Sequence, residues 1–236
     1  MDSLCYPIQL AWMLYANTGN ADHFDAEFIA GVKKILDVFE TEQHHERSPY
    51  FFIRDTDIPT ESLSNNGKGS PVAYTGMTWS GFRPSDDACT YHYLVPSNMF
   101  AAVVMGYLER IFGGEILDDA DIAARAGKLR RTITEGIEAH AKTTNRNGET
   151  IYAFETDGLG HVNIMDDSNV PSLMAAPYFG VLHTGRSDRI WRPDARCSAN
   201  ENPYYYEGEY LKGIGSPHTP PRYVWPIALS IGGDDQ

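Results

Sequence analysis

Two adjacent carboxylates, Asp86 and Asp87, are the residues of this sequence best suited to acid–base chemistry. Like-charge repulsion between neighbouring carboxylates raises their pKa, and partial burial raises it further. A carboxyl group that stays protonated near neutral pH can act as a general acid. An isolated Asp-Asp pair is more often a helix cap or a loop-ordering hydrogen bond. The pair is flanked by four aromatic residues, which favour a sugar-binding pocket: Trp79, Phe82, Tyr91 and Tyr93.

The arrangement around this pair recurs further along the chain. Asp86-Asp87 is followed by Pro96 and an apolar run, and Asp166-Asp167 is followed by Pro171 and another apolar run. A third polar loop, 213–219, precedes the apolar run after Trp225. Proline is tolerated at the start of a helix, where its missing N–H has no partner to lose. Three polar loops that enter helices in this way would open at one mouth of a helical ring, where we expect a pocket.

Helical periodicity dominates the elements that must position these loops. Segments 25–40 and 119–140 each carry one apolar stripe, whereas 97–112 is apolar nearly all round and is expected to be buried. Alternation of buried and amphipathic helices favours hairpins in an inner and an outer ring, a mainly α (α/α) toroid. A flat helical bundle is the competing arrangement. The shorter expected elements are apolar segments 4–15, 171–182 and 223–231 and a β element at 150–154.

Composition narrows the possible partners. The 236 residues carry 32 acidic and 19 basic side chains, a net charge of −13. This charge disfavours nucleic acid and acidic membrane surfaces, and a neutral substrate is unaffected by it. No segment approaches the ~20 apolar residues of a membrane span.

The cysteines Cys5, Cys89 and Cys197 lack metal-binding spacing and are expected to be buried free thiols. No metal is expected at His44-His45 either, because adjacent side chains diverge on a helix.

The stretch Tyr74-Thr75-Gly76-Met77-Thr78-Trp79-Ser80-Gly81-Phe82-Arg83-Pro84-Ser85-Asp86-Asp87-Ala88 resembles the hallmark segment of glycoside hydrolase family 125. The resemblance extends over essentially the whole chain, and a match of this length is highly specific. It predicts one glycoside hydrolase domain over residues 1–236. The other matching segments are 42–45, 93–100, 167–173, 213–219 and 225–226.

The resemblance implies an (α/α)6 barrel that removes terminal α-1,6-linked mannose from mannans or N-glycans with inversion and without a metal or other cofactor. Inversion uses an acid and a base, with carboxyls about 6.5–9.5 Å apart. The acid maps onto Asp86 or Asp87; Asp86 is preferred here and Asp87 is the alternative. For Asp166 and Asp167, helix capping competes with sugar binding. The expected substrate-binding residues are His44, Trp79, Arg83, Ser85, Asp166, Asp167, Asn169, Gly215, Ser216, His218 and Trp225.

The general base implied by the resemblance is a glutamate in a Met-His-Glu-Ser-like stretch beyond Trp225-Pro226, and the sequence contains no Met-His-Glu. The segment from Asp2 matches an internal part of the family. We therefore expect an incomplete barrel, truncated at both ends and inactive by itself. Exposed apolar faces, such as that of Val103, Val104 and Met105, would then favour self-association. The alternatives are an inactive fragment or a residual sugar-binding module and, less favoured, a toroid glycosidase or lyase of other linkage specificity.

Overall fold

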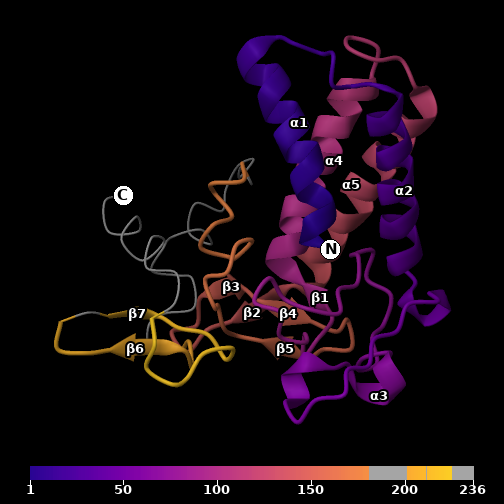
Figure 1. Cartoon of the computed structure of the whole chain (residues 1–236). Coiled ribbons are helices and arrows are strands. Elements are labelled where there is room, and N and C mark those ends of the chain that lie inside the picture. Colours follow the sequence, from indigo (N-terminus) through magenta and orange to yellow (C-terminus); the bar gives the residue numbers. More distant parts are fainter. Residues whose placement is uncertain (181–200, 211, 225–236) are drawn as a thin grey trace.

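The computed structural model describes residues 1–180, 201–210 and 212–224. Two helical hairpins form its main body: α1 (Cys5–Thr18) with α2 (Ala26–Glu42), and α4 (Val95–Phe112) with α5 (Ala120–His140). Figure 1 shows the hairpins side by side, with α4 packed against α1 and α5, and α5 against α2. The fold is mainly helical and of the α/α type, as the sequence pattern predicted.

Local sequence explains where these helices begin and end. The carboxylate of Asp25 accepts a hydrogen bond from the Phe28 N–H at the start of α2, and Asp119 accepts from the Ile122 N–H at the start of α5. Both are N-caps of the preferred type. Helix α4 carries a proline in its first turn. Helix α1 ends at Thr18 and is capped by Gly19, whose left-handed φ of 70° costs glycine no steric strain.

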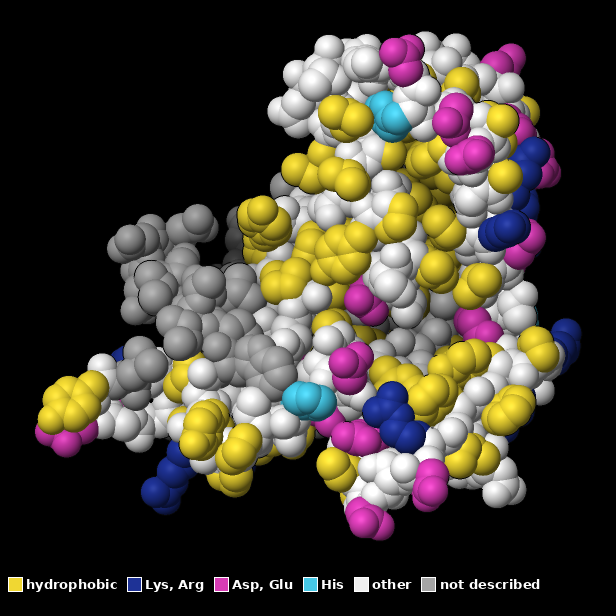
Figure 2. Space-filling view, in the orientation of Figure 1, with side chains coloured by type: hydrophobic (Ala, Val, Ile, Leu, Met, Phe, Trp, Pro, Cys, Tyr) yellow, Lys and Arg dark blue, Asp and Glu magenta, His cyan; other side chains and the backbone are white. Residues whose placement is uncertain are grey.

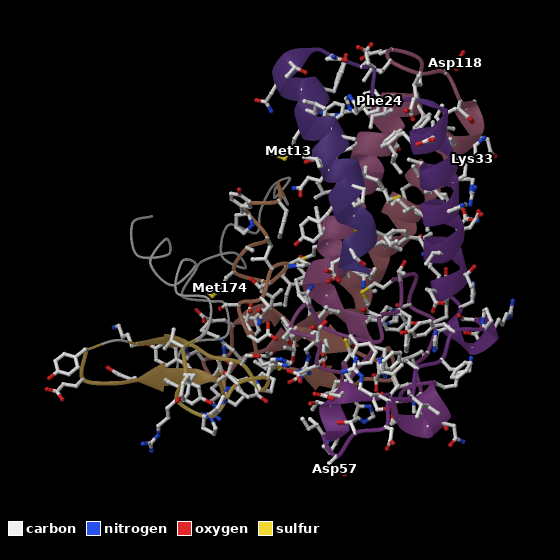
Figure 3. The ribbon with its side chains drawn as sticks, viewed as in Figure 1. Met13, Phe24, Lys33, Asp57, Asp118 and Met174 are labelled. Atoms are coloured by element: carbon white, nitrogen blue, oxygen red, sulfur yellow. The ribbon has the colours of Figure 1, made fainter. Side chains whose placement is uncertain are left out.

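The buried residues confirm the prediction that α4 is a buried helix and that α2 and α5 each carry one apolar stripe. In α4, every residue from Val95 to Ala101 is buried, so the first turns are buried all round, and Val104, Met105 and Leu108 continue one buried side. Helices α2 and α5 each bury one stripe. Phe24 packs between the rings of Tyr15 and Phe28 at the end of the helices opposite the strands (Figure 3).

Short strands and long loops gather at the other end of the helices, where α2 and α5 finish and α4 begins (Figure 1). Strands β1 (Tyr93–Leu94), β4 (Glu155–Thr156) and β5 (Val162–Asn163) form an antiparallel sheet in the order β1-β4-β5. The hairpins β2–β3 (Lys142–Thr144, Thr150–Tyr152) and β6–β7 (Tyr205–Glu207, Lys212–Ile214) complete the strands, of which β3 confirms the expected β element. The remaining elements are the 3-10 turns η1 (Asp2–Leu4), η2 (His45–Arg47) and η3 (Pro59–Glu61) and the short, irregular α3 (Ser64–Gly67).

The helix expected over 171–182 does not form within its described part. Residues 173–180 form turns instead. Pro177 disfavours a helix here, because it has no N–H to donate and restricts the residue before it to non-helical geometry. Of the segment expected at 223–231, only Tyr223 and Val224 are described, and neither is helical. The other residues of these two segments lie outside the described part of the chain.

The prediction that Val103, Val104 and Met105 lack packing partners was wrong. Val104 and Met105 are fully buried and Val103 is half-buried, because α4 lies between α1 and α5. Exposed apolar side chains do cluster on α1, where Leu10, Met13 and Leu14 are 71%, 49% and 46% exposed. Met13 points away from the helix body in Figure 3, and Figure 2 shows apolar side chains gathered over this face.

The two described cysteines, Cys5 and Cys89, are free and buried, as expected. Burial raises the pKa of both thiols, which keeps them protonated and unreactive. Cys197 lies outside the described residues. None of the described helices combines the length and apolarity needed to cross a membrane.

Candidate functional site

A tight turn separates the two carboxylates of the Asp86–Asp87 pair. The Asp86 N–H donates to the Arg83 carbonyl (3.0 Å), and the Arg83 N–H donates to the Asp87 carbonyl (2.8 Å). Asp86 adopts the left-handed region, with φ 69°, at the tip of the turn. Its side chain is therefore exposed, whereas Asp87 is only 1% exposed. Adjacent in sequence, the two residues occupy different environments.

The buried carboxylate of Asp87 faces two polar side chains. The Ser85 hydroxyl donates to Asp87 Oδ2 at 3.4 Å, and His218 Nδ1 lies 3.6 Å from Asp87 Oδ1. His218 comes from the third polar loop, whose Ser216 hydroxyl accepts the His218 N–H at 3.2 Å. The structure thus brings together two of the loops expected to share a mouth.

The second carboxylate pair, Asp166 and Asp167, is buried completely or nearly so. Asp166 accepts hydrogen bonds from the N–H groups of Ser168 (2.7 Å) and Met174 (3.3 Å). Burial, together with the neighbouring charge of Asp167, raises the pKa of Asp166 to about 7. The carboxyl therefore changes its protonation state near neutral pH.

Asp167 connects this loop to the Asp86–Asp87 turn. Its Oδ1 accepts the Asn169 N–H at 3.1 Å, while its buried Oδ2 has no hydrogen-bond partner among the described residues. Burial raises the pKa of Asp167, and the nearby Asn169 amide, Ser85 hydroxyl and Arg83 guanidinium counteract that rise. A buried unpaired carboxylate oxygen is suited to accept a hydrogen bond from a ligand hydroxyl.

Arg83 is the cation of the cluster and is itself buried. Its Nε donates to Glu155 Oε1 at 2.6 Å, and one terminal nitrogen donates to the Thr90 hydroxyl at 3.3 Å. Burial alone would lower the pKa of Arg83, but the charge and hydrogen bond of Glu155 raise it above its ordinary value. The guanidinium is thus paired with Glu155, and the charge of Asp167 acts on it as well.

The β6–β7 hairpin joins the third loop to the other two. Asn202 donates to the Asp166 carbonyl (2.7 Å) and accepts the Tyr204 N–H (3.0 Å), while the Tyr204 carbonyl accepts the Gly215 N–H (2.7 Å). A side chain at Gly215 would clash, since its Cβ would lie 2.3 Å from the Tyr223 carbonyl oxygen. Gly215 and Ser216 therefore shape the loop that presents His218.

Several of the predicted site residues form this cluster and others lie outside it. Trp79 is 3% exposed and packs between the rings of His45 (3.5 Å) and His92 (4.6 Å), so neither ring face is free for a sugar. His44 stacks on Tyr74 at the surface. Trp225 lies outside the described residues. The predicted residues that the structure brings together are Arg83, Ser85, Asp87, Asp166, Asp167, Asn169, Gly215, Ser216 and His218.

Sequence reasoning missed Glu155 and Asn202. For Glu155 the available signal was an acidic residue directly after the apolar run Ile151–Phe154. Asn202 carried no comparable signal, because its role depends on backbone contacts between distant loops. For Tyr204, in the run 204–206, the sequence favours loop packing over a sugar platform, and its backbone does join two loops. No group of three or more potential ligands among the described residues is arranged to hold a metal ion.

The raised pKa of Asp166 predicts a stability change with pH. Because its folded-state pKa lies above its unfolded value, the folded protein binds this proton more tightly, and stability falls as pH rises from about 4 to about 7. Asp166→Asn should remove this dependence, so the wild type should lose on the order of 3 kcal/mol more stability than the variant over that interval. Urea unfolding of both proteins at pH 4.5 and 7.5 measures the difference. Parallel losses in the two proteins would contradict the prediction.

Comparison with known proteins places the chain in a family. A family model described as metal-independent α-mannosidase (GH125) matches residues 1–233. The Meiotically up-regulated gene 157 protein of Schizosaccharomyces pombe is 34% identical over 243 residues, covering 98% of this chain and 47% of the relative. A Streptococcus pneumoniae structure from a study of metal-independent α-mannosidases, a non-productive complex with α-1,6-mannobiose, matches with TM-score 0.92 and 54% identity.

That match covers 98% of this chain and 54% of the solved one. The chain therefore spans about half the length of these relatives. The family match over nearly every residue agrees with the resemblance of the 74–88 segment and with the α/α-type fold. The chain belongs to glycoside hydrolase family 125, the metal-independent α-mannosidases.

Proposed function

We propose that this chain is part of an inverting exo-α-mannosidase that removes terminal α-1,6-linked mannose from mannans or N-glycans. The observation that carries the proposal is the buried Asp87 carboxyl, held between Ser85 and His218. The similar S. pneumoniae structure, whose ligand is α-1,6-mannobiose, supports the choice of linkage.

Asp87, rather than the Asp86 preferred from the sequence, is the proposed general acid. Asp86 is exposed at the tip of the turn, whereas Asp87 faces the cluster that contains Arg83 and Asp167. In its protonated form Asp87 gives its proton to the glycosidic oxygen as the bond from that oxygen to C1 breaks. Water attacks C1 from the opposite face and passes its proton to the base, so the product has the inverted configuration.

Asp167 and Asn169 are the proposed ligands of mannose hydroxyls, with Arg83 as a further donor. Asp167 Oδ2 is buried without a hydrogen-bond partner among the described residues, and a sugar hydroxyl would satisfy it. His218 is proposed to face the sugar beside Asp87. Trp79 is left out because its two ring faces are covered.

The proposed base is a glutamate that the 236 residues do not contain. We therefore propose that the (α/α)6 barrel of the family is incomplete here, and that this chain binds the sugar without hydrolysing it. A protein extended to the length of its relatives should release mannose from α-1,6-mannobiose, and far more slowly from the α-1,2- and α-1,3-linked disaccharides. Equal release from all three would reject the proposed linkage specificity, and release from none would reject the proposed activity.

The second candidate is a sugar-binding module without a catalytic role, favoured by the absence of a Met-His-Glu sequence. Two measurements distinguish the candidates: isothermal titration of this chain with α-1,6-mannobiose, and the hydrolysis assay of the extended protein. Binding by this chain and no mannose release by the extended protein would favour the binding module. Release by the extended protein would favour the enzyme.

The exposed apolar face of α1 predicts that this chain self-associates, with α1 of one copy contacting a second copy. Leu10, Met13 and Leu14 lie within about one turn of one another and form an exposed apolar patch, which favours association in water. The double variant Leu10→Lys/Met13→Lys should shift the protein towards monomer in light scattering after size-exclusion chromatography. Val38→Lys on α2, a single apolar site that is 43% exposed, serves as the control. A wild type that is monomeric at all concentrations would contradict the prediction.

A further inference from the structure

Glu155 has the most complete set of hydrogen-bond donors around any carboxylate near the site. It is 0% exposed, and Arg83 Nε donates to its Oε1 at 2.6 Å. Its Oε2 accepts from the Thr90 N–H (3.1 Å), the Tyr91 N–H (3.2 Å) and Asn163 Nδ2 (3.1 Å). A buried carboxylate with four donors is held in one orientation and is costly to disturb.

Three of these four donors come from the two sides of the Asp86–Asp87 turn. Arg83 lies four residues before Asp87, and Thr90 and Tyr91 lie three and four residues after it. Glu155 itself belongs to β4, where it pairs with Leu94 of β1 and Asn163 of β5. One side chain of a three-stranded sheet therefore fastens the two arms of the turn that presents the acid.

The turn has few other anchors outside itself. Its internal bonds, from Arg83 N–H to Asp87 and from Cys89 N–H to Gly81, set its shape but not its position relative to the sheet. The Ala88 N–H donates to the Thr60 carbonyl (2.7 Å) in the neighbouring loop. Through its hydrogen bonds to Arg83, Thr90 and Tyr91, Glu155 thus ties the turn to β4.

Glu155 also balances the charge of Arg83. The guanidinium pairs with Glu155, and its positive charge lowers the pKa of Asp167 against the effect of burial. When Glu155 loses its negative charge, less of the positive charge of Arg83 is offset, so Arg83 acts more strongly on Asp167. Cys89 and His92 also face Glu155 and Arg83, and Asp87, Asp166, Tyr204 and His218 lie in the same part of the site.

We propose that Glu155 is a positioning residue, which fastens the turn carrying Asp87 to the β1-β4-β5 sheet and holds the Arg83 guanidinium in place. This inference rests on the proposed function of Asp87 as the acid. Glu155 acts through Arg83, Thr90 and Tyr91 and does not touch the substrate. Glu155 thereby holds the sugar site in a fixed position relative to strand β4.

The test replaces Glu155 by glutamine and follows the turn directly. Glu155→Gln keeps the shape of the side chain but removes its charge and one acceptor oxygen. Amide hydrogen exchange of peptides covering 82–92 should accelerate, while peptides from α4 and α5 should remain protected. Affinity for α-1,6-mannobiose should fall by about tenfold or more, since small displacements of a site have effects of this size.

The pH dependence of mannobiose binding separates positioning from a general loss of stability. Because the uncompensated Arg83 favours ionised Asp167, the acid-side midpoint of binding should fall by about one pH unit in Glu155→Gln. A general loss of stability would leave that midpoint in place. Glu40→Gln is the matched control, since Glu40 pairs with Arg125 between α2 and α5, away from the turn. It should change neither exchange at 82–92 nor the midpoint.

A second variant keeps the test decisive if Glu155→Gln does not fold. Asn163→Ala removes one donor to Glu155 and leaves the carboxylate and its bond to Arg83 in place. It should accelerate exchange at 82–92 to a smaller degree. Unchanged exchange at 82–92 in the folded variants would overturn the inference. A wild type that does not bind mannobiose would reject the proposed sugar binding by this chain, and the exchange results would still decide the role of Glu155.

Discussion

Replacement of Asp87 by asparagine should lower mannose release from α-1,6-mannobiose by about 10²–10⁴-fold in a protein extended to the length of its relatives. Asparagine occupies nearly the same volume but has no acidic proton to give to the leaving oxygen. Asp87 is 1% exposed, with Ser85 Oγ at 3.4 Å and His218 Nδ1 at 3.6 Å, so no bulk water is in place to substitute for it.

Asp86→Asn is the matched control, because it makes the same chemical change one residue away. Asp86 is exposed at φ 69°, a conformation that asparagine tolerates well, so the turn should survive and most activity should remain. Rates measured at substrate concentrations well below and well above KM separate a loss of chemistry from a loss of binding. A large loss in Asp86→Asn with an active Asp87→Asn would reverse the assignment.

Arg83→Met should destabilise the fold by about 3–5 kcal/mol, the range measured when one partner of a buried ion pair is removed. Glu155 is 0% exposed and would remain charged in the interior with only its three neutral donors. Methionine fills part of the arginine volume, so the effect reports mainly on the lost charge. Urea unfolding followed by circular dichroism measures the difference in free energy from the wild type.

Arg125→Met provides the comparison for this variant. Arg125 bonds to Glu40 (2.8 Å) and Asp37 (2.6 Å) between α2 and α5, where Asp37 is 67% exposed. Solvent weakens such surface pairs, so we expect a loss of about 0–1 kcal/mol. Equal losses of unfolding free energy in Arg83→Met and Arg125→Met would contradict the expectation that burial makes the Arg83–Glu155 pair costlier to break.

Much of the helical framework could be predicted from local sequence. The apolar stripe through Val32 and Phe39 and the cap at Asp25 mark α2, and the cap at Asp119 marks α5, because periodicity and capping are properties of neighbouring residues. The apolar run that forms α4 was expected to be buried, and it is. The family was likewise recognisable from the 74–88 segment.

The extent of burial could not be predicted in the same way. As a consequence of an incomplete barrel, Val104 and Met105 were expected to lose their partners, but α1 and α5 cover them, and Leu10 and Met13 on α1 are exposed. Which face of a helix finds a partner depends on how the hairpins pack. Packing joins residues far apart in the chain, and no local pattern encodes it.

The sequence by itself determined the four long helices of the described chain, the family and the carboxylate pair from which the acid is proposed. Only the tertiary structure distinguished Asp87 from Asp86, because one left-handed residue turns one carboxylate outward and leaves the other buried. The structure likewise covered Trp79 and brought Glu155 beneath Arg83, 72 residues away in the chain. A carboxylate owes its chemical role to burial and to its neighbours, and both are set where distant loops meet.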